Sequence, residues 1–84
     1  MNVVKIFVQD TCPNCPPSKE LGKELAKKGL NVEVHNIRTP DGLAESLMHD
    51  ILSTPSTVVF KNGVKVKSYL GITPKIDELL EALT

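Results

Sequence analysis

Strand-like segments of two kinds constrain the fold of this chain most strongly. The runs Val3–Val8 and Thr57–Phe60 are almost continuously apolar and β-branched, which suits strands that are buried on both faces of a sheet. The segments Asn31–Ile37 and Val64–Tyr69 alternate between apolar and polar residues, which is typical of half-exposed strands at a sheet edge. These patterns together predict one four-stranded sheet with two central and two edge strands.

Two segments with helical periodicity lie between these strands. The first spans Ser18–Lys28, with regular hydrogen bonding expected to start near Cys15, and it ends at Gly29. The second runs from the Thr39 cap to about Ile51. The residues expected to face the core are Leu21, Leu25 and Ala26 in the first helix and Leu43, Ala44, Leu47 and Met48 in the second.

A third helix is expected at the end of the chain. Thr73 reads as its N-cap and Pro74 as its first residue. The apolar spacing of i, i+3, i+4 and i+7 then predicts a buried stripe of Ile76, Leu79, Leu80 and Leu83.

The order of these elements is strand, helix, strand, helix, strand, strand, helix. It predicts an α/β fold, βαβαββα, in a single domain over residues 1–84. Short links make the first two strands a parallel pair in a right-handed βαβ unit. Asn62-Gly63 is a strong hairpin signal that pairs the last two strands. We therefore expect a mixed sheet in the order 2-1-3-4, with helices on both faces.

The only two cysteines form the motif Cys12-Pro13-Asn14-Cys15, between the first strand and the first helix. Cysteines three apart at a helix start lie about one turn apart, with both sulfurs on the same side. A disulfide across so short a loop adds little stability, because little chain entropy is removed from the unfolded state. Such a bond is better suited to opening and closing. In a reducing compartment the motif favours redox or metal chemistry.

Composition and charge exclude several classes of partner. Ten basic and ten acidic side chains give a formal net charge of zero, so we expect no nucleic-acid or anionic-membrane partner. The longest apolar run is too short to span a bilayer, and Met1-Asn2 leads directly into a strand without a signal-peptide core. We expect a cytoplasmic monomer.

With this element order and motif, the sequence resembles the thioredoxin/glutaredoxin superfamily over essentially its whole length. The likeness is greatest to small glutaredoxin-like redoxins, including the archaeal thioredoxin-like proteins. Thr54-Pro55 stands where family members carry a cis-proline loop, and Gly71 stands where they carry a glycine after the last strand. An ordinary trans proline at the start of a strand is the alternative at Pro55. The resemblance implies a thioredoxin-like fold and reduction of protein disulfides.

Site residues follow from the motif and the resemblance. Cys12 is the expected nucleophile, because helix amides and the helix dipole favour its thiolate, and Cys15 is the expected resolving thiol. Pro13 and Asn14 would tune the redox potential. The redox-active Cys12–Cys15 disulfide would be the only redox group, with no other cofactor and no metal. The expected substrate-binding residues are Thr11, Thr54, Pro55 and Gly71, with the Thr54 backbone pairing with an extended segment.

The chain also departs from the family pattern. Ile6 stands where thioredoxins carry a buried acid, six residues before the first cysteine. The segment Gly71-Ile72-Thr73-Pro74 replaces the Gly-Gly-x-x-Asp-like segment of glutathione-binding glutaredoxins. As electron donor we therefore expect a reductase like thioredoxin reductase rather than glutathione.

A second hypothesis uses the same cysteines without catalysis. The chain would then be a zinc or iron–sulfur carrier, or a redox-regulated interaction module that uses the Thr54-Pro55 edge. Zinc requires four ligands, and only His35 and His49 could complete the pair. Their spacing fits no finger or ribbon, and the expected topology places them on an edge strand and on the far side of a helix. The sequence therefore favours the oxidoreductase.

Overall fold

The computed structural model describes residues 2–10 and 12–83 of the chain. The observed order of elements is the predicted βαβαββα. Their bounds are β1 (Val3–Val8), α1 (Cys15–Lys27), β2 (Asn31–Asn36), α2 (Pro40–Met48), β3 (Ser56–Lys61), β4 (Val64–Leu70) and α3 (Ile76–Leu83).

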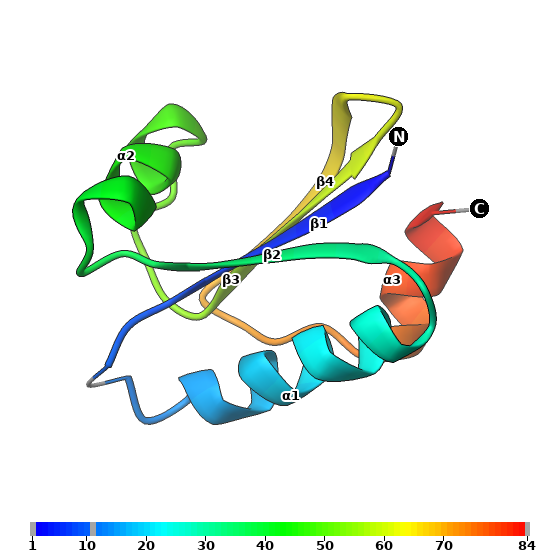
Figure 1. Ribbon diagram of the computed structural model, residues 1–84, viewed down its shortest axis with the longest axis horizontal. Helices are drawn as coiled ribbons and strands as arrows, with labels where there is room; N and C mark the ends of the chain where they lie inside the picture. The colour runs from blue at the N-terminus through cyan, green and yellow to red at the C-terminus, as the bar shows by residue number, and fades with distance from the viewer. Residues whose placement is uncertain (1, 11, 84) are drawn as a thin grey trace.

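The four strands form one mixed sheet in the order β2-β1-β3-β4, which confirms the predicted order. β1 pairs in parallel with β2 and antiparallel with β3, and β3 pairs antiparallel with β4. The β3–β4 turn places Asn62 and Gly63 at φ angles of 54° and 81°, the left-handed conformation that an Asn-Gly hairpin requires. Figure 1 shows α1 and α3 on one side of the sheet and α2 on the other.

The core lies in two layers, one on each face of the sheet. Successive side chains of a strand point to opposite faces, so the even-numbered residues of β1 face α1 and the odd-numbered ones face α2. The larger cluster, under α1 and α3, includes Val4, Ile6, Val8, Leu25, Val59 and Leu79 together with both cysteines. The smaller cluster, on the α2 side, consists of Phe7, Ile51 and Val58.

Helix α1 begins and ends close to its predicted limits. Its first residue is Cys15, and Pro16 and Pro17 follow in the first turn, where a missing amide costs no helical hydrogen bond. At the other end Gly29 adopts a φ of 83° just beyond the Lys28 cap, as predicted for a terminating glycine.

The buried face of α1 differs in part from the prediction. Leu21 and Leu25 are buried as expected, but Ala26 is exposed. The remaining buried positions of the helix are Cys15, Ser18 and Gly22. The apolar spacing identified the correct side of the helix, but a small polar residue and a glycine complete the contact with the sheet.

Helix α2 turns a different face to the sheet from the predicted one. The prediction that Leu43, Ala44, Leu47 and Met48 face the core is wrong, because all four are exposed. The buried positions are instead Gly42 and Ser46. The helix also ends at Met48, three residues before the predicted end.

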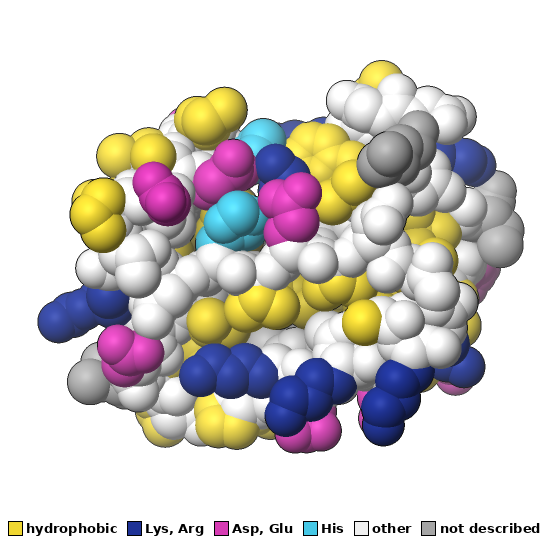
Figure 2. Space-filling view, viewed as in Figure 1, with side chains coloured by type: hydrophobic (Ala, Val, Ile, Leu, Met, Phe, Trp, Pro, Cys, Tyr) yellow, Lys and Arg dark blue, Asp and Glu magenta, His cyan; other side chains and the backbone are white. Residues whose placement is uncertain are grey.

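The reason lies in the sheet face beneath α2. Lys5 of β1 is half-buried there, and its Nζ donates a hydrogen bond to Glu45 Oε2 at 3.0 Å and lies 3.5 Å from His49 Nε2. A half-buried ammonium group requires polar partners, so the polar face of α2 turns inward to supply them. Figure 2 shows the histidines among acidic and basic side chains, beside apolar side chains that stand out into solvent from α2.

Helix α3 starts later than predicted. It begins at Ile76, and the backbone carbonyl of Lys75 accepts from the amides of Glu78 and Leu79. The predicted N-cap role of Thr73 is therefore wrong, since its hydroxyl is hydrogen-bonded to Ser18 instead. The predicted stripe is present: Leu79 is fully buried, and Ile76, Leu80 and Leu83 pack against the larger cluster.

Within the described residues, no helix combines the length and the apolarity that crossing a bilayer requires.

Candidate active site

Cys12 and Cys15 are joined by a disulfide at the junction of the loop after β1 and the start of α1, with their Cα atoms 5.3 Å apart. The loop is a tight turn in which the Cys15 amide donates to the Cys12 carbonyl at 3.3 Å and the Cys12 amide donates to the Gln9 carbonyl at 3.3 Å. Cys15 is fully buried, whereas Cys12 retains 8% of its surface. Cys12 is therefore the more accessible of the two cysteines.

The residues between and after the cysteines determine how far the N-terminus of α1 can stabilise a Cys12 thiolate. Pro13 and Asn14 are both exposed, and Asn14 is the N-cap residue without a capping hydrogen bond from its side chain. Pro16 and Pro17 lack backbone N–H groups, which removes two of the amides that a helix N-terminus offers to an anion. Stabilisation of a Cys12 thiolate therefore depends on the helix dipole more than on free amides.

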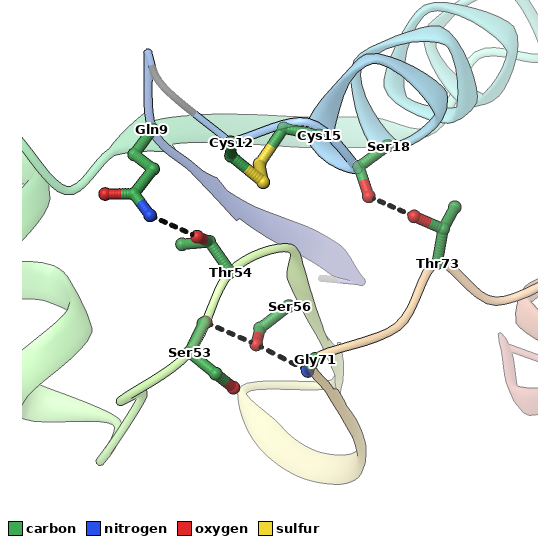
Figure 3. The surroundings of a disulfide bond; sticks show 9 residues. All are labelled: Gln9, Cys12, Cys15, Ser18, Ser53, Thr54, Ser56, Gly71 and Thr73. Carbon is green, nitrogen blue, oxygen red and sulfur yellow. Dashed lines mark hydrogen bonds between the residues drawn. A yellow bond between two sulfur atoms is a disulfide. The ribbon is translucent and has the colours of Figure 1, made fainter.

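The loop before β3 faces the disulfide. The Thr54–Pro55 peptide bond is cis, which confirms the prediction and excludes the trans alternative. Figure 3 shows Thr54 on the side of the loop that faces the two sulfurs. Gln9 Nε2 donates to Thr54 Oγ1 at 3.0 Å and so links the segment before the cysteines to this loop.

Ser56, which the sequence analysis did not single out, connects two loops near the disulfide, the loop before β3 and the loop after β4. Its hydroxyl is fully buried, donates to the Ser53 carbonyl at 2.7 Å and accepts from the Gly71 amide at 3.2 Å. Gly71 adopts a φ of 75°, which favours glycine. The predicted substrate-binding positions Thr54, Pro55 and Gly71 therefore lie on loops that one serine holds together (Figure 3). Thr11, the fourth, lies outside the described residues.

A second missed residue is Ser18, one turn after Cys15 on α1. It is fully buried, and its Oγ lies 2.5 Å from Thr73 Oγ1 in the segment between β4 and α3. A serine on the apolar face of a predicted helix is the only sequence signal for it. The Thr73 partner could not be identified, because the two residues are 55 positions apart.

The histidines do not join the cysteines. His35 stacks on Phe7 with ring centroids 5.4 Å apart, and His49 meets the same ring edge-on at 6.4 Å. Phe7 belongs to the cluster on the α2 side, opposite the cluster that contains Cys12 and Cys15. The two histidines are therefore neighbours, which the expected topology did not foresee. In residues 2–10 and 12–83 no group of three or more His, Cys, Asp or Glu side chains has the geometry of a metal site.

Comparison with known proteins finds similar sequences among thioredoxins. The chain is 32% identical over 63 residues to a probable thioredoxin of Archaeoglobus fulgidus, an alignment that covers 70% of this chain and 66% of that protein. It is 30% identical over 79 residues to the chloroplastic M-type thioredoxin of Spinacia oleracea, covering 86% of this chain and 42% of that protein. The chain thus spans less than half of the spinach relative. No protein-family model matches the chain.

Solved structures show the same fold. A mutant thioredoxin from Halobacterium salinarum superposes with a TM-score of 0.82 at 20% identity, over 98% of this chain and 71% of that one. Thioredoxin O2 from Arabidopsis thaliana in its oxidised state gives a TM-score of 0.80 at 19% identity, over 96% and 70% of the two chains. At these identities the superposition supports only the fold. Any argument about chemistry rests on the cysteine pair itself.

Proposed function

The chain belongs to the thioredoxin/glutaredoxin superfamily, and from that premise we propose that it is a small oxidoreductase that reduces the disulfides of partner proteins. One observation carries the proposal: the Cys12–Cys15 disulfide faces the cis Thr54–Pro55 loop, with Cys12 8% exposed and Cys15 fully buried. A structural disulfide gains nothing from such asymmetry, whereas an exchange reaction needs one attacking and one resolving sulfur.

The cycle transfers two electrons through the pair. In the reduced protein the Cys12 thiolate attacks a partner disulfide, forming a mixed disulfide and releasing one partner sulfur as a thiolate. The Cys15 thiol then loses its proton and attacks Cys12 Sγ, which forms the Cys12–Cys15 bond and releases the second partner sulfur. The partner gains two electrons and two protons in total. The dithiol of a reductase restores the reduced protein by the reverse exchange.

The loops around the disulfide offer a surface for an extended substrate segment. Main-chain groups of Thr54 would pair with such a segment, as in strand addition. Leu52 and Ile72 flank the two loops and are 88% and 56% exposed, far more than most leucines and isoleucines. We propose that they provide apolar contacts to the substrate, which would be an apolar, extended stretch around a disulfide.

The electron donor follows from the same residues. Gly71-Ile72-Thr73-Pro74 carries no side-chain carboxylate to bind the ammonium group of glutathione, and a flavin-dependent reductase like thioredoxin reductase is the preferred donor. We propose that the chain acts as a monomer in the cytoplasm.

The deciding experiment is redox equilibration against a glutathione buffer, read by mass after alkylation of free thiols. We expect a reversible two-electron transition at about −180 to −270 mV, the range from disulfide isomerase to thioredoxin. The same preparation should reduce insulin disulfides when a reductase supplies electrons. A lack of reversible transition, or thiols that become free only after a chelator is added, would contradict the proposal and favour a metal carrier. Metal content of the purified protein distinguishes the two, whereas cysteine variants inactivate both.

A further inference from the structure

The proposed cycle requires the buried Cys15 thiol to lose a proton, and the buried cluster around it contains no carboxylate among the described residues. Ile6, fully buried in the same cluster, occupies the position of the buried acid of thioredoxins. Among the buried members of this cluster the titratable side chains are Cys12, Cys15 and Tyr69.

Within residues 2–10 and 12–83, the charged groups around the cluster are distant or exposed. Every charged side chain on α1, β4 and α3 is exposed, as are Asp10 and Lys75. Lys5 of β1 points to the opposite face, and Lys61 lies at the far end of β3. The proton must therefore leave through groups of another kind.

The first buried polar side chain after Cys15 along α1 is the hydroxyl of Ser18. Ser18 lies three residues further along α1, and side chains with that spacing are neighbours on a helix surface. Figure 3 shows the Ser18 side chain on the same side of the helix as the disulfide. A helical serine commonly bonds back to a carbonyl of the preceding turn, but the Ser18 hydroxyl reaches across to Thr73. Thr73 is only half-buried, so the pair leads from the buried sulfur toward solvent.

We propose that Ser18 and Thr73 form a hydroxyl pair that carries the Cys15 proton to solvent and stabilises the Cys15 thiolate, in place of the missing acid. The inference rests on the proposed function. Either oxygen of the pair can be the donor. With Ser18 donating to Thr73, the Ser18 oxygen can accept from the Cys15 S–H. With Thr73 donating to Ser18, the Ser18 O–H is free to donate to the thiolate.

Transfer of the Cys15 proton to water reverses the direction of the hydrogen bond between Ser18 and Thr73. The Cys15 proton passes to the Ser18 oxygen, the Ser18 proton passes to Thr73, and the Thr73 proton passes to water. Both hydroxyls end uncharged, with their direction of donation reversed. The Cys15 thiolate then attacks Cys12 Sγ, and the departing partner sulfur takes up a proton from water. Neither hydroxyl is consumed, so each turnover can use them again.

The two steps can be observed separately with a limiting amount of an aromatic disulfide that releases a coloured thiolate. Attack by Cys12 releases the first thiolate, and resolution by Cys15 releases the second in a first-order phase. In Ser18→Ala and Thr73→Val we expect the first phase to be unchanged. The second should slow about tenfold near neutral pH, which corresponds to the loss of one hydrogen bond to the sulfur. The rate should recover at high pH, where the thiol ionises unaided.

Three controls separate this role from a structural one. Thr73→Ser keeps the hydroxyl and should retain the wild-type pH profile. Thr57→Val removes another buried hydroxyl of the sheet, one without a hydrogen-bond partner among the described residues, and should leave both phases unchanged. Cys15→Ser should abolish the second phase and so identify it.

Each outcome decides a different point. If Ser18→Ala and Thr73→Val lower the melting temperature but leave the pH profile of the second phase unchanged, the pair only fastens α1 to the segment before α3 and the inference is wrong. An equal slowing of both phases, or the same shift in Thr57→Val, also overturns it. If the wild-type protein gives no first phase, the proposed function itself fails.

Discussion

Lys5 of β1 and Glu45 of α2 form an ion pair of 3.0 Å in the half-buried space between sheet and helix, where their side chains are 17% and 26% exposed. The hydrogen bond and the charge of Lys5 hold the pKa of Glu45 below its ordinary value of 4.5, against the opposing effect of burial. A carboxyl with a lowered pKa in the folded state stabilises the fold above its unfolded-state pKa. This contribution is lost as the pH falls through the folded-state value.

Glu45→Gln should therefore lower the free energy of unfolding at neutral pH by about 1 kcal/mol, the upper range for partly exposed ion pairs. The difference from the wild type should shrink as the pH falls below 4.5 and vanish below the lowered folded-state pKa, where the carboxyl group is protonated in both states. Urea unfolding at a series of pH values measures both effects. Glu20→Gln is the matched control, because the Glu20–Lys23 pair is exposed and 3.5 Å apart, and it should cause no measurable change. A difference that is independent of pH would contradict the assigned role of the Glu45 charge.

The rotation of α2 can be tested with two leucines. Leu47 is 60% exposed and Leu25 is fully buried, although both lie on predicted apolar faces. Leu47→Ala should change the free energy of unfolding by less than about 0.5 kcal/mol. Leu25→Ala should cost about 2–5 kcal/mol, because it leaves a cavity in the core. Chemical denaturation of the two variants measures the contrast, and similar costs at both positions would show that α2 packs its apolar face after all.

Ser56→Ala should loosen the two loops beside the disulfide while leaving both cysteines in place. It leaves the Gly71 amide without its acceptor and the Ser53 carbonyl without its donor, at a cost of about 1–3 kcal/mol. Hydrogen exchange at Gly71 should accelerate, and the rate of insulin reduction should fall as the two loops separate. Ser53→Ala is the control, because only the backbone of Ser53 takes part in the contact. Exchange at Gly71 that is equally slow in Ser56→Ala would rule out this fastening.

Gly42 and Gly22 should respond to the same substitution in opposite ways. Alanine usually stabilises a helix interior relative to glycine by about 1 kcal/mol. At position 42 the new methyl group would overlap the backbone carbonyl of Asn36, so Gly42→Ala should be destabilising by about 2 kcal/mol. At position 22 the nearest atom is the flexible end of Ile6 at 3.2 Å, so Gly22→Ala should be nearly neutral. Thermal unfolding measures both, and a stabilised Gly42→Ala variant would contradict the observed packing of α2.

Local sequence patterns were sufficient for the elements and their order. Continuous apolar runs marked β1 and β3, alternation marked the edges, and Asn62-Gly63 fixed the last hairpin, because each depends on neighbouring residues alone. The paired cysteines were readable from their motif spacing, whereas the cis bond at Thr54-Pro55 was expected only from the resemblance to the thioredoxin/glutaredoxin superfamily. Periodicity failed for α2, since it measures the apolar stripe of a helix and contains no information about the charged residue beneath it.

The sequence by itself determined the strand order and the place of the cysteine motif, and the resemblance to the superfamily indicated the loop that faces it. Only the tertiary structure decided which way α2 turns, which serine fastens the loops and what lies beside Cys15. Lys5 meets Glu45 across 40 positions, and Ser18 meets Thr73 across 55. Such contacts depend on the relative placement of packed elements, whereas hydrophobic patterning acts within one element. A half-buried lysine and a buried hydroxyl each require a polar partner. This requirement outweighed the apolar periodicity of α2 and the capping preference of Thr73 at the start of α3.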